Sequence, residues 1–154
     1  MSVMEIKTAG APVLKQVCEP VRRVDSKIKK LLDQMKDTLY KANGVGLAAP
    51  QVGVPVRVVV IDAGTGYYEL INPEIVERSG TQLDTEGCLS VPGIWGEVER
   101  SAKVTVEFTN RRGKRQRIKD ATGLLARCIQ HELDHLEGVL FIDIAKSLRE
   151  ERAE

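Results

Sequence analysis

The stretch "CIQHELDHLEG", residues 128–138, holds both histidines of the 154-residue chain, four positions apart. Residues at i and i+4 lie one turn apart on the same helix face, so His131 and His135 can direct both imidazoles at one metal ion. Glu132 is rotated by about 100° from His131, which suits it to reach a metal-activated water rather than to share the ligand role. The alternative is a pair of core histidines satisfied by hydrogen bonds, and so short a motif does not decide between the two.

The residues around this motif predict a helix buried at the centre of the fold. From Thr122 onward the apolar positions recur with a helical period and cover most of the circumference, and Gly138 ends the helix. These positions are Leu124, Leu125, Cys128, Ile129, Leu133 and Leu136. Two histidines in the middle of such a helix need partners, because unpaired polar groups cost free energy when buried.

The rest of the chain predicts one further long helix and several strands. Residues 25–44 have a helical apolar period, with Asp25 or Ser26 as the cap and Gly44 as the stop. We expect strands at 56–62, buried on both faces, and at 67–75, a hairpin of 103–110 with 114–120, and a surface helix or frayed tail at 146–154. The prediction is an α+β fold with antiparallel sheets around the buried C-terminal helix, plus the N-terminal helix, in a single domain of residues 1–154.

Composition and charge are ordinary for a globular protein, with 42% apolar residues, 29% charged residues and a net charge of +1. Overall charge therefore selects no acidic partner. No apolar run approaches the length that spans a bilayer, and the first residues resemble neither a secretory signal nor a transit peptide. The three widely spaced cysteines argue against a disulfide framework and for a reducing compartment. We expect a cytoplasmic protein in which Cys18 is a small buried hydrophobe.

A catalytic metal needs a third protein ligand and an open coordination position. The position where a long zincin motif has its third histidine is Phe141, and the glutamates well beyond His135 lie in a short tail. A cysteine thiolate is the remaining strong candidate. Cys88, in "TEGCLSVPG" at 85–93, is favoured over Cys128, because a ligand from a separate segment closes a tetrahedral site more easily.

A glycine-rich stretch, "GVGLAAPQ" at 44–51, follows the first predicted helix. Taken alone it is a helix cap and a turn, and it lacks the lysine and hydroxyl residue of a phosphate loop. Small residues also let the backbone approach a ligand closely. The Gln51 side chain would then offer an amide to a developing oxyanion.

The three segments "GVGLAAPQ", "EGCLS" and "QHELDHLEG" resemble, in order and spacing, the motifs of the peptide deformylase family. The resemblance covers most of the chain, from the first helix through Gly138. It implies an enzyme that removes the N-formyl group from the initiator formyl-methionine of new polypeptides and releases formate. It also implies one divalent metal per chain, Fe(II) in the cell with zinc, nickel or cobalt able to replace it, on the ligands Cys88, His131 and His135.

The resemblance also implies roles for neighbouring residues. A metal-bound water would attack the formyl carbon, with Glu132 as general base and then general acid. Gln51 and the backbone N–H of Leu89 would stabilise the oxyanion. The substrate-binding positions that it implies are Gly44, Val45, Gly46, Glu86, Gly87 and Cys128. Glu86 would pair with Arg100, and Asp134 would orient a neighbour, although both are also read as plain ion pairs.

The implied partners are nascent formyl-methionyl peptides and, transiently, the ribosome, with no membrane and no sequence-specific nucleic acid. The basic stretch 110–119 is predicted to be a solvated face. Arg127 lies one turn before His131, where the resemblance implies a pocket for the methionine side chain and an apolar residue would suit better. We therefore expect Arg127 to extend outward or to mark a different substrate edge. Trp95 either lines the mouth of the site or is a core or edge aromatic. The rival functions are a zinc-dependent peptidase and a metal-binding or redox-sensing module without turnover.

Overall fold

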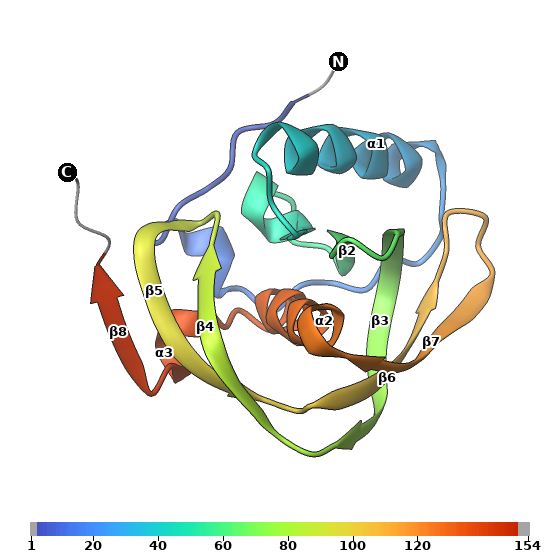
Figure 1. The fold of residues 1–154 in the computed structure, drawn as a ribbon. Coiled ribbons are helices and arrows are strands. Elements are labelled where there is room, and N and C mark those ends of the chain that lie inside the picture. Colours follow the sequence, from blue (N-terminus) through green and yellow to red (C-terminus); the bar gives the residue numbers. More distant parts are fainter. Residues whose placement is uncertain (1–2, 151–154) are drawn as a thin grey trace.

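The computed structural model describes residues 3–150, which form an α+β fold of two antiparallel sheets arranged around a central helix (Figure 1). The elements follow one another as a 3₁₀ helix at Pro12–Lys15, α1 (Ser26–Lys41), β1 (Gly46–Ala48), a 3₁₀ helix at Ala49–Val52, β2 (Val58–Asp62), β3 (Tyr67–Ser79), β4 (Gln82–Cys88), β5 (Val91–Arg100), β6 (Lys103–Thr109), β7 (Arg115–Thr122), α2 (Gly123–Leu136), α3 (Phe141–Ile144) and β8 (Ser147–Glu150). The predicted fold class is confirmed. No helix within residues 3–150 has the length and apolar character needed to cross a membrane.

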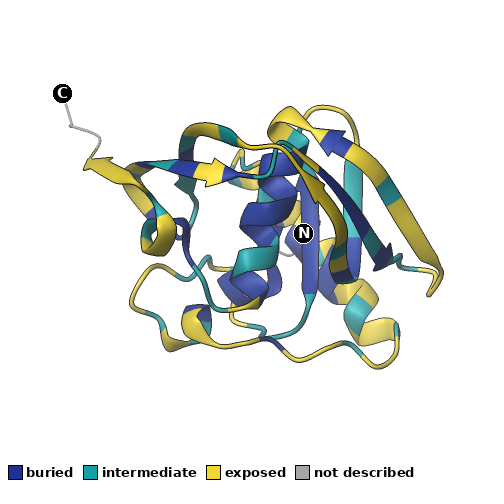
Figure 2. Cartoon of the chain, turned by 90° about the horizontal axis from the view of Figure 1, so that it is seen from below, coloured by how far each residue is buried: buried dark blue, intermediate teal, exposed yellow. Residues whose placement is uncertain are grey.

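The two sheets differ in size and in the elements that they support. One sheet has five strands in the order β1-β2-β3-β6-β7, and the other has three in the order β4-β5-β8. Helix α2 contacts β1, β2, β6 and β7. Figure 2 shows most of α2 in the colour of buried residues. The predicted burial of the motif-bearing helix is confirmed.

Strand β2 is the structural centre of the larger sheet, because both of its faces are covered. Val59 and Ile61 pack in the cluster that includes α2, whereas Val58 and Val60 pack in the cluster that includes α1. All four side chains are fully buried. Side chains alternate between the two faces of a strand, so this continuous apolar run is what a doubly covered strand requires. The predicted strand is therefore confirmed for Val58–Asp62, and residues 56 and 57 precede it.

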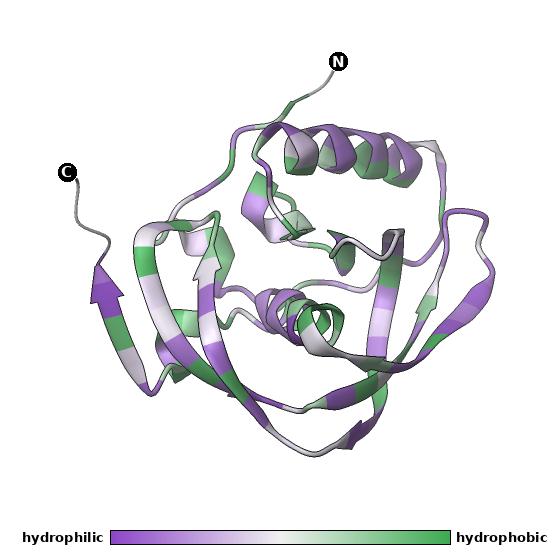
Figure 3. Ribbon diagram, in the orientation of Figure 1, coloured by the Kyte–Doolittle hydropathy of each residue, from purple (hydrophilic) through white to green (hydrophobic). Residues whose placement is uncertain are grey.

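Helix α1 begins as predicted and ends slightly earlier. The side chain of Asp25 accepts a hydrogen bond of 3.0 Å from the backbone N–H of Ile28, which satisfies one free donor of the first turn. Figure 3 shows hydrophobic and hydrophilic residues alternating around this helix. The residue in the left-handed conformation after the helix is Asn43, with φ of 56°, and not the predicted Gly44. Asparagine tolerates this conformation, so it ends the helix before the glycine is reached.

Two segments differ from the sequence-based expectation. No strand was expected around Cys88, but β4 and β5 form a hairpin there, with Glu86 opposite Gly96 and Cys88 opposite Val91. The tail was expected to be a helix or frayed, but β8 pairs with β5, whereas residues 151–154 lie outside the described part. Neither β4 nor β8 has a clear apolar period. Both strands are specified by main-chain pairing with β5, which a local sequence pattern does not reveal. The hairpin of β6 and β7 is confirmed.

Candidate metal centre and active site

Helix α2 carries three of the predicted site residues in its buried middle. His131, Glu132 and His135 have exposed fractions of 8%, 3% and 1%, so the motif is not a solvated face. The two imidazole rings lie 5.1 Å apart, centroid to centroid, at 71° to one another. The helix starts at Gly123, with φ of 57°, and is followed by Gly138, with φ of 76°, so both glycines allow the turns that position it. The spacing i, i+4 thus aims both rings at one region.

Cys88 comes to the histidines from the smaller sheet, at the end of β4. Its Sγ lies 3.4 Å from Nε2 of His135. One ligand atom from each of Cys88, His131 and His135 lies within 4.8 Å of the other two, and residues 3–150 contain no other such group of metal-ligating side chains. Cys128 lies beside this group on α2 but is not part of it. The structure therefore brings together the three ligands that the resemblance implies.

The surroundings of these atoms suit a metal ion. The backbone N–H of Ser90 and the Nε2 amide of Gln51 both donate to Cys88 Sγ, at 3.4 and 3.6 Å, which fixes the position of the sulfur. Nδ1 of His135 is buried without a hydrogen-bond partner in the described structure. One thiolate and two imidazoles are a donor set for Fe(II), Co(II), Ni(II) or Zn(II), and three protein ligands leave one tetrahedral position open. The residues present fit such an ion.

Glu132 directly follows His131 on α2, and it has the properties of a proton carrier. Burial raises the pKa of Glu132 to about 7. Its Oε1 has no hydrogen-bond partner in the described structure. Strand β1 passes directly over its other oxygen, since a Cβ built on Gly46 would lie 2.7 Å from Oε2. A buried carboxyl with a pKa near neutrality suits general base and acid chemistry.

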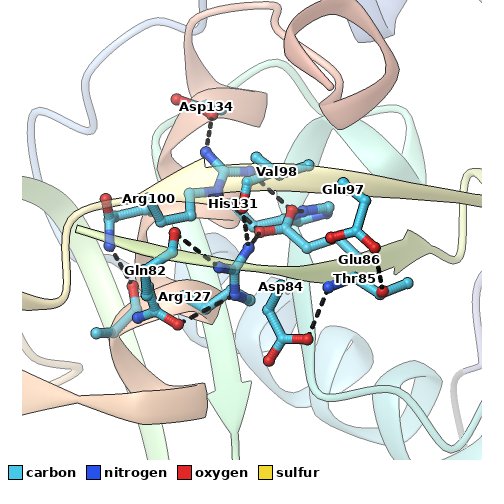
Figure 4. Close-up of polar contacts among 12 residues, drawn as sticks. Gln82, Asp84, Thr85, Glu86, Glu97, Val98, Arg100, Arg127, His131 and Asp134 are labelled. Atoms are coloured by element: carbon cyan, nitrogen blue, oxygen red, sulfur yellow. Dashed lines mark hydrogen bonds and ion pairs between the residues drawn. The ribbon is translucent and has the colours of Figure 1, made fainter. Parts of the chain in front are cut away.

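A buried network of charges lies behind His131 (Figure 4). Glu86 accepts 2.9 and 2.8 Å hydrogen bonds from Nε and Nη2 of Arg100, and its Oε1 lies 2.8 Å from Nδ1 of His131. Arg100 also donates to Asp134, at 2.5 Å. Burial raises the pKa of Glu86, but the hydrogen bonds from Arg100 and His131 outweigh it and lower the pKa to about 2. Glu86 is therefore a carboxylate that fixes the His131 ring through Nδ1 and leaves Nε2 available to a metal ion.

Arg127 belongs to the same network, which corrects the sequence-based expectation. It was expected to extend outward or to mark a substrate edge, but only 4% of the residue is exposed and its Nη1 is paired with Glu86. The sequence pattern did not reveal this because Arg127 and Glu86 are 41 positions apart. An arginine on an apolar helix is tolerated when its charge is paired and its N–H groups have acceptors.

A cavity of about 470 Å³ opens onto the metal-ligand group. It is lined by Gly44, Val45 and Gly46 of the glycine-rich stretch, by Glu86, Gly87, Cys88 and Leu89, and by Leu124, Arg127, Cys128, His131 and Glu132 of the helix segment, among others. Trp95 also lines it and is 39% exposed, so it lies at the mouth. Gln51 is buried behind this lining, and its Nε2 donates to Ser90 Oγ at 3.0 Å. Arg100 and Asp134 lie outside the cavity, behind His131.

A family model described as polypeptide deformylase matches residues 3–151. The chain belongs to the polypeptide deformylase family. The resemblance inferred from the three motifs is thereby confirmed.

Known deformylases match this chain along nearly all of its length. The peptide deformylase of Desulfitobacterium hafniense is 59% identical over 146 residues, which cover 95% of this chain and 97% of the relative. The crystal structure of the Thermotoga maritima peptide deformylase has a TM-score of 0.92 at 43% identity and covers 96% of this chain and 100% of that one. The Synechococcus elongatus peptide deformylase, solved in complex with actinonin, has a TM-score of 0.90 at 43% identity and covers 94% of this chain and 79% of that one.

Two residues contribute to this deformylase site that the sequence analysis did not assign. The Ser90 hydroxyl accepts a hydrogen bond from Gln51, and its backbone N–H donates to Cys88 Sγ. A serine close to a cysteine in sequence matches no motif, so the sequence did not predict this role. Phe141 stacks on His131, with centroids 6.0 Å apart and an interplanar angle of 28°. Phe141 is 1% exposed and belongs to the apolar segment 139–144. Its burial could be predicted from that segment, but its contact with His131 could not.

Proposed function

We propose that this chain removes the N-formyl group from formyl-methionyl peptides at the centre formed by Cys88, His131 and His135. The observation that supports this most is the convergence of the three ligand atoms within 4.8 Å, beside the buried carboxyl of Glu132 and at the wall of a cavity. Deformylases are metal-dependent hydrolases of this reaction class. The resident ion in the cell is proposed to be Fe(II), with Zn(II), Ni(II) or Co(II) as replacements.

When bound, the ion polarises the formyl carbonyl and lowers the pKa of water so that it becomes a nucleophile near neutral pH. Glu132 takes the proton of the attacking water on its unpartnered oxygen and passes it to the departing amine, which makes it base and then acid. A pKa of about 7 suits both halves of this role at neutral pH. Glu86 holds the His131 ring during this exchange.

Stabilisation of the oxyanion that develops on the formyl oxygen is assigned to the Gln51 amide and to the backbone N–H of Leu89. Leu89 directly follows Cys88 in the turn between β4 and β5 and lines the cavity. The Gln51 amide is held close by, because its Oε1 accepts a 2.9 Å hydrogen bond from the backbone N–H of Ala48. Fixed N–H donors stabilise a developing negative charge without reorganising during the reaction.

The substrate is placed in the cavity of about 470 Å³ between β1 and β4. The methionine side chain is assigned to the apolar wall near Val45 and Cys128. Gly44, Gly46, Gly87 and Glu86 are assigned to the walls that hold its backbone, because all four residues line this cavity. Trp95 already covers Gly87, where an added Cβ would lie 2.6 Å from the indole ring. We further propose one catalytic domain for the whole chain, a cytoplasmic location and a transient contact with the ribosome, because nascent chains carry the substrate.

The test is release of formate from formyl-Met-Ala by protein purified without oxygen, with acetyl-Met-Ala as the control. Formate release, with little reaction of the acetyl peptide, is expected, because the larger acyl group needs more room beside Gly46. A peptidase would release an amino acid instead, and a sensor would release neither product. Replacing Fe(II) by Ni(II) or Co(II) should preserve activity in air, because Fe(II) is the ion that oxygen oxidises. Equal loss of activity in air for all three metals would contradict the assignment of Fe(II).

A further inference from the structure

The buried arginine of α2 has more partners than a structural ion pair requires. Besides pairing with Glu86, Arg127 Nη1 donates to the Val98 carbonyl at 2.9 Å. Its Nε donates to Gln82 Oε1 and its Nη2 to the Gln82 carbonyl, each at 3.3 Å. Figure 4 shows the guanidinium between β4, β5 and α2. One planar group thus fixes the helix that carries the histidines to the hairpin that carries Cys88.

Arg127 and His131 are also one turn apart on α2, and they reach the same carboxylate. His131 contacts Glu86 Oε1, whereas Arg127 contacts Oε2. Arg100 donates to both oxygens from β5. The carboxylate is held by cations from two elements, and rotation away from His131 would break the contacts of both. Glu86 and Arg127 have side chains that are 4% and 5% exposed, so water offers little replacement.

The charges of this network balance only when Arg127 is counted. Arg100 and Arg127 supply two positive charges, and Glu86 and Asp134 supply two negative ones. Without Arg127, a single arginine would face two carboxylates at the back of His131. Removing one member of a buried, paired set leaves the others uncompensated, which favours their rearrangement.

We propose that Arg127 is a positioning residue that holds Glu86 against His131 and thereby strengthens metal binding by Cys88, His131 and His135. The proposal rests on the metal site argued above. It assigns to Arg127 no contact with the reacting atoms. Partners that orient a metal-ligating histidine typically change metal affinity by about 10- to 100-fold when they are mutated.

The test is metal affinity, measured by competition between the protein and a chromophoric chelator for Co(II) and for Zn(II). Arg127→Met removes the charge and the hydrogen bonds while keeping an unbranched apolar stem, and we expect affinity to fall by about 10- to 100-fold. Arg127→Lys keeps the charge without the planar fork, so it should recover part of the loss. Arg117→Met is the matched control, because Arg117 pairs with Glu107 on the exposed face of the larger sheet. Its affinity should equal that of the unmodified protein.

The visible spectrum of the Co(II) protein gives a second measurement, since it reports ligand geometry. We expect a changed spectrum for Arg127→Met and an unchanged one for Arg117→Met. A folded Arg127→Met variant that binds metal within about twofold of the unmodified protein, and only unfolds more easily, would overturn the proposal. If that variant does not fold, Gln82→Ala, which removes one acceptor of Arg127, should weaken binding to a smaller degree. Unchanged affinity in both Gln82→Ala and Arg127→Lys would then overturn the proposal. Failure of the unmodified protein to bind metal would instead contradict the metal site itself.

Discussion

Gly46 and Glu132 lie so close together that no larger residue fits at position 46 without displacing the carboxylate. A Cβ built on Gly46 would lie 2.7 Å from Glu132 Oε2 and 2.6 Å from Cys128 Sγ. Real Cβ atoms essentially never approach other heavy atoms so closely. A glycine is therefore needed at position 46 to leave space for the Glu132 and Cys128 side chains.

Gly46→Ala should accordingly lower the rate of formate release strongly while metal remains bound, because Glu132 must move. Gly44→Ala is the control, since its nearest neighbour, at 2.8 Å, is the flexible end of the Leu89 side chain. We expect Gly44→Ala to be the milder change of the two. Kinetics and metal content of both variants provide the measurement, and equal activity of Gly46→Ala and the unmodified protein would contradict the close contact.

Glu132→Gln should leave metal binding nearly intact and lower turnover by about 10²- to 10⁴-fold, which is the usual contribution of a general acid–base group. The reason is that glutamine keeps the shape of the side chain but cannot carry the proton. Turnover and metal content of the purified variant decide this. Loss of metal in proportion to activity would show that Glu132 acts on the metal site rather than on the proton.

Gln51→Leu should slow the chemical step by roughly 10²-fold or more, because one oxyanion donor is lost. The structure adds a second expected effect, since the Gln51 amide also contacts Cys88 Sγ and Ser90 Oγ. Ser90→Ala separates the loss of the oxyanion donor from the loss of the amide's contacts. It removes the hydroxyl that holds the Gln51 amide but keeps the amide itself. An unchanged maximal rate for Gln51→Leu, with only weaker substrate binding, would contradict the oxyanion role.

Cys18 and Cys128 should resist alkylation in the folded protein at pH 8. Burial raises the pKa of Cys18 to about 11 and raises the pKa of Cys128 well above its usual value. The reactive thiolate is scarce below a thiol's pKa, so both remain protonated at this pH. Mass spectrometry after iodoacetamide treatment, with the denatured protein as control, tests this. Rapid labelling of either cysteine before unfolding would contradict the burial described.

The sequence predicted the parts of the fold that have a strong local period. Helix α2 has apolar residues around most of its circumference, and β2 begins with an unbroken run of three valines and an isoleucine, so both could be predicted from the local sequence pattern. The hairpin of β4 and β5 could not, because Gly87, Gly93 and Gly96 interrupt any period there. Strand β8 could not either, because its four exposed residues show no alternation of buried and exposed positions. Main-chain pairing with β5 specifies them instead.

For the site, the spacing of His131 and His135 was sufficient to predict that they share one face. The sequence alone only favoured Cys88 over Cys128, and the resemblance to deformylases was needed to assign it. The partners behind His131 were harder to predict, since Glu86, Arg127 and Phe141 come from three separate segments. Buried ion pairs between distant segments depend on how the sheets pack, and no local pattern encodes that packing.

The central claim, that Cys88 completes the metal centre, is tested most directly by metal content. Cys88→Ser and Cys128→Ser should be purified under argon and analysed for bound metal per chain. The predicted result is loss of the metal from Cys88→Ser, because a serine hydroxyl stays protonated at neutral pH and is a poor replacement for a thiolate. Cys128→Ser should keep about one metal per chain, since its Sγ is not among the three convergent ligand atoms. Retention of the metal by Cys88→Ser together with its loss from Cys128→Ser would contradict the proposed site.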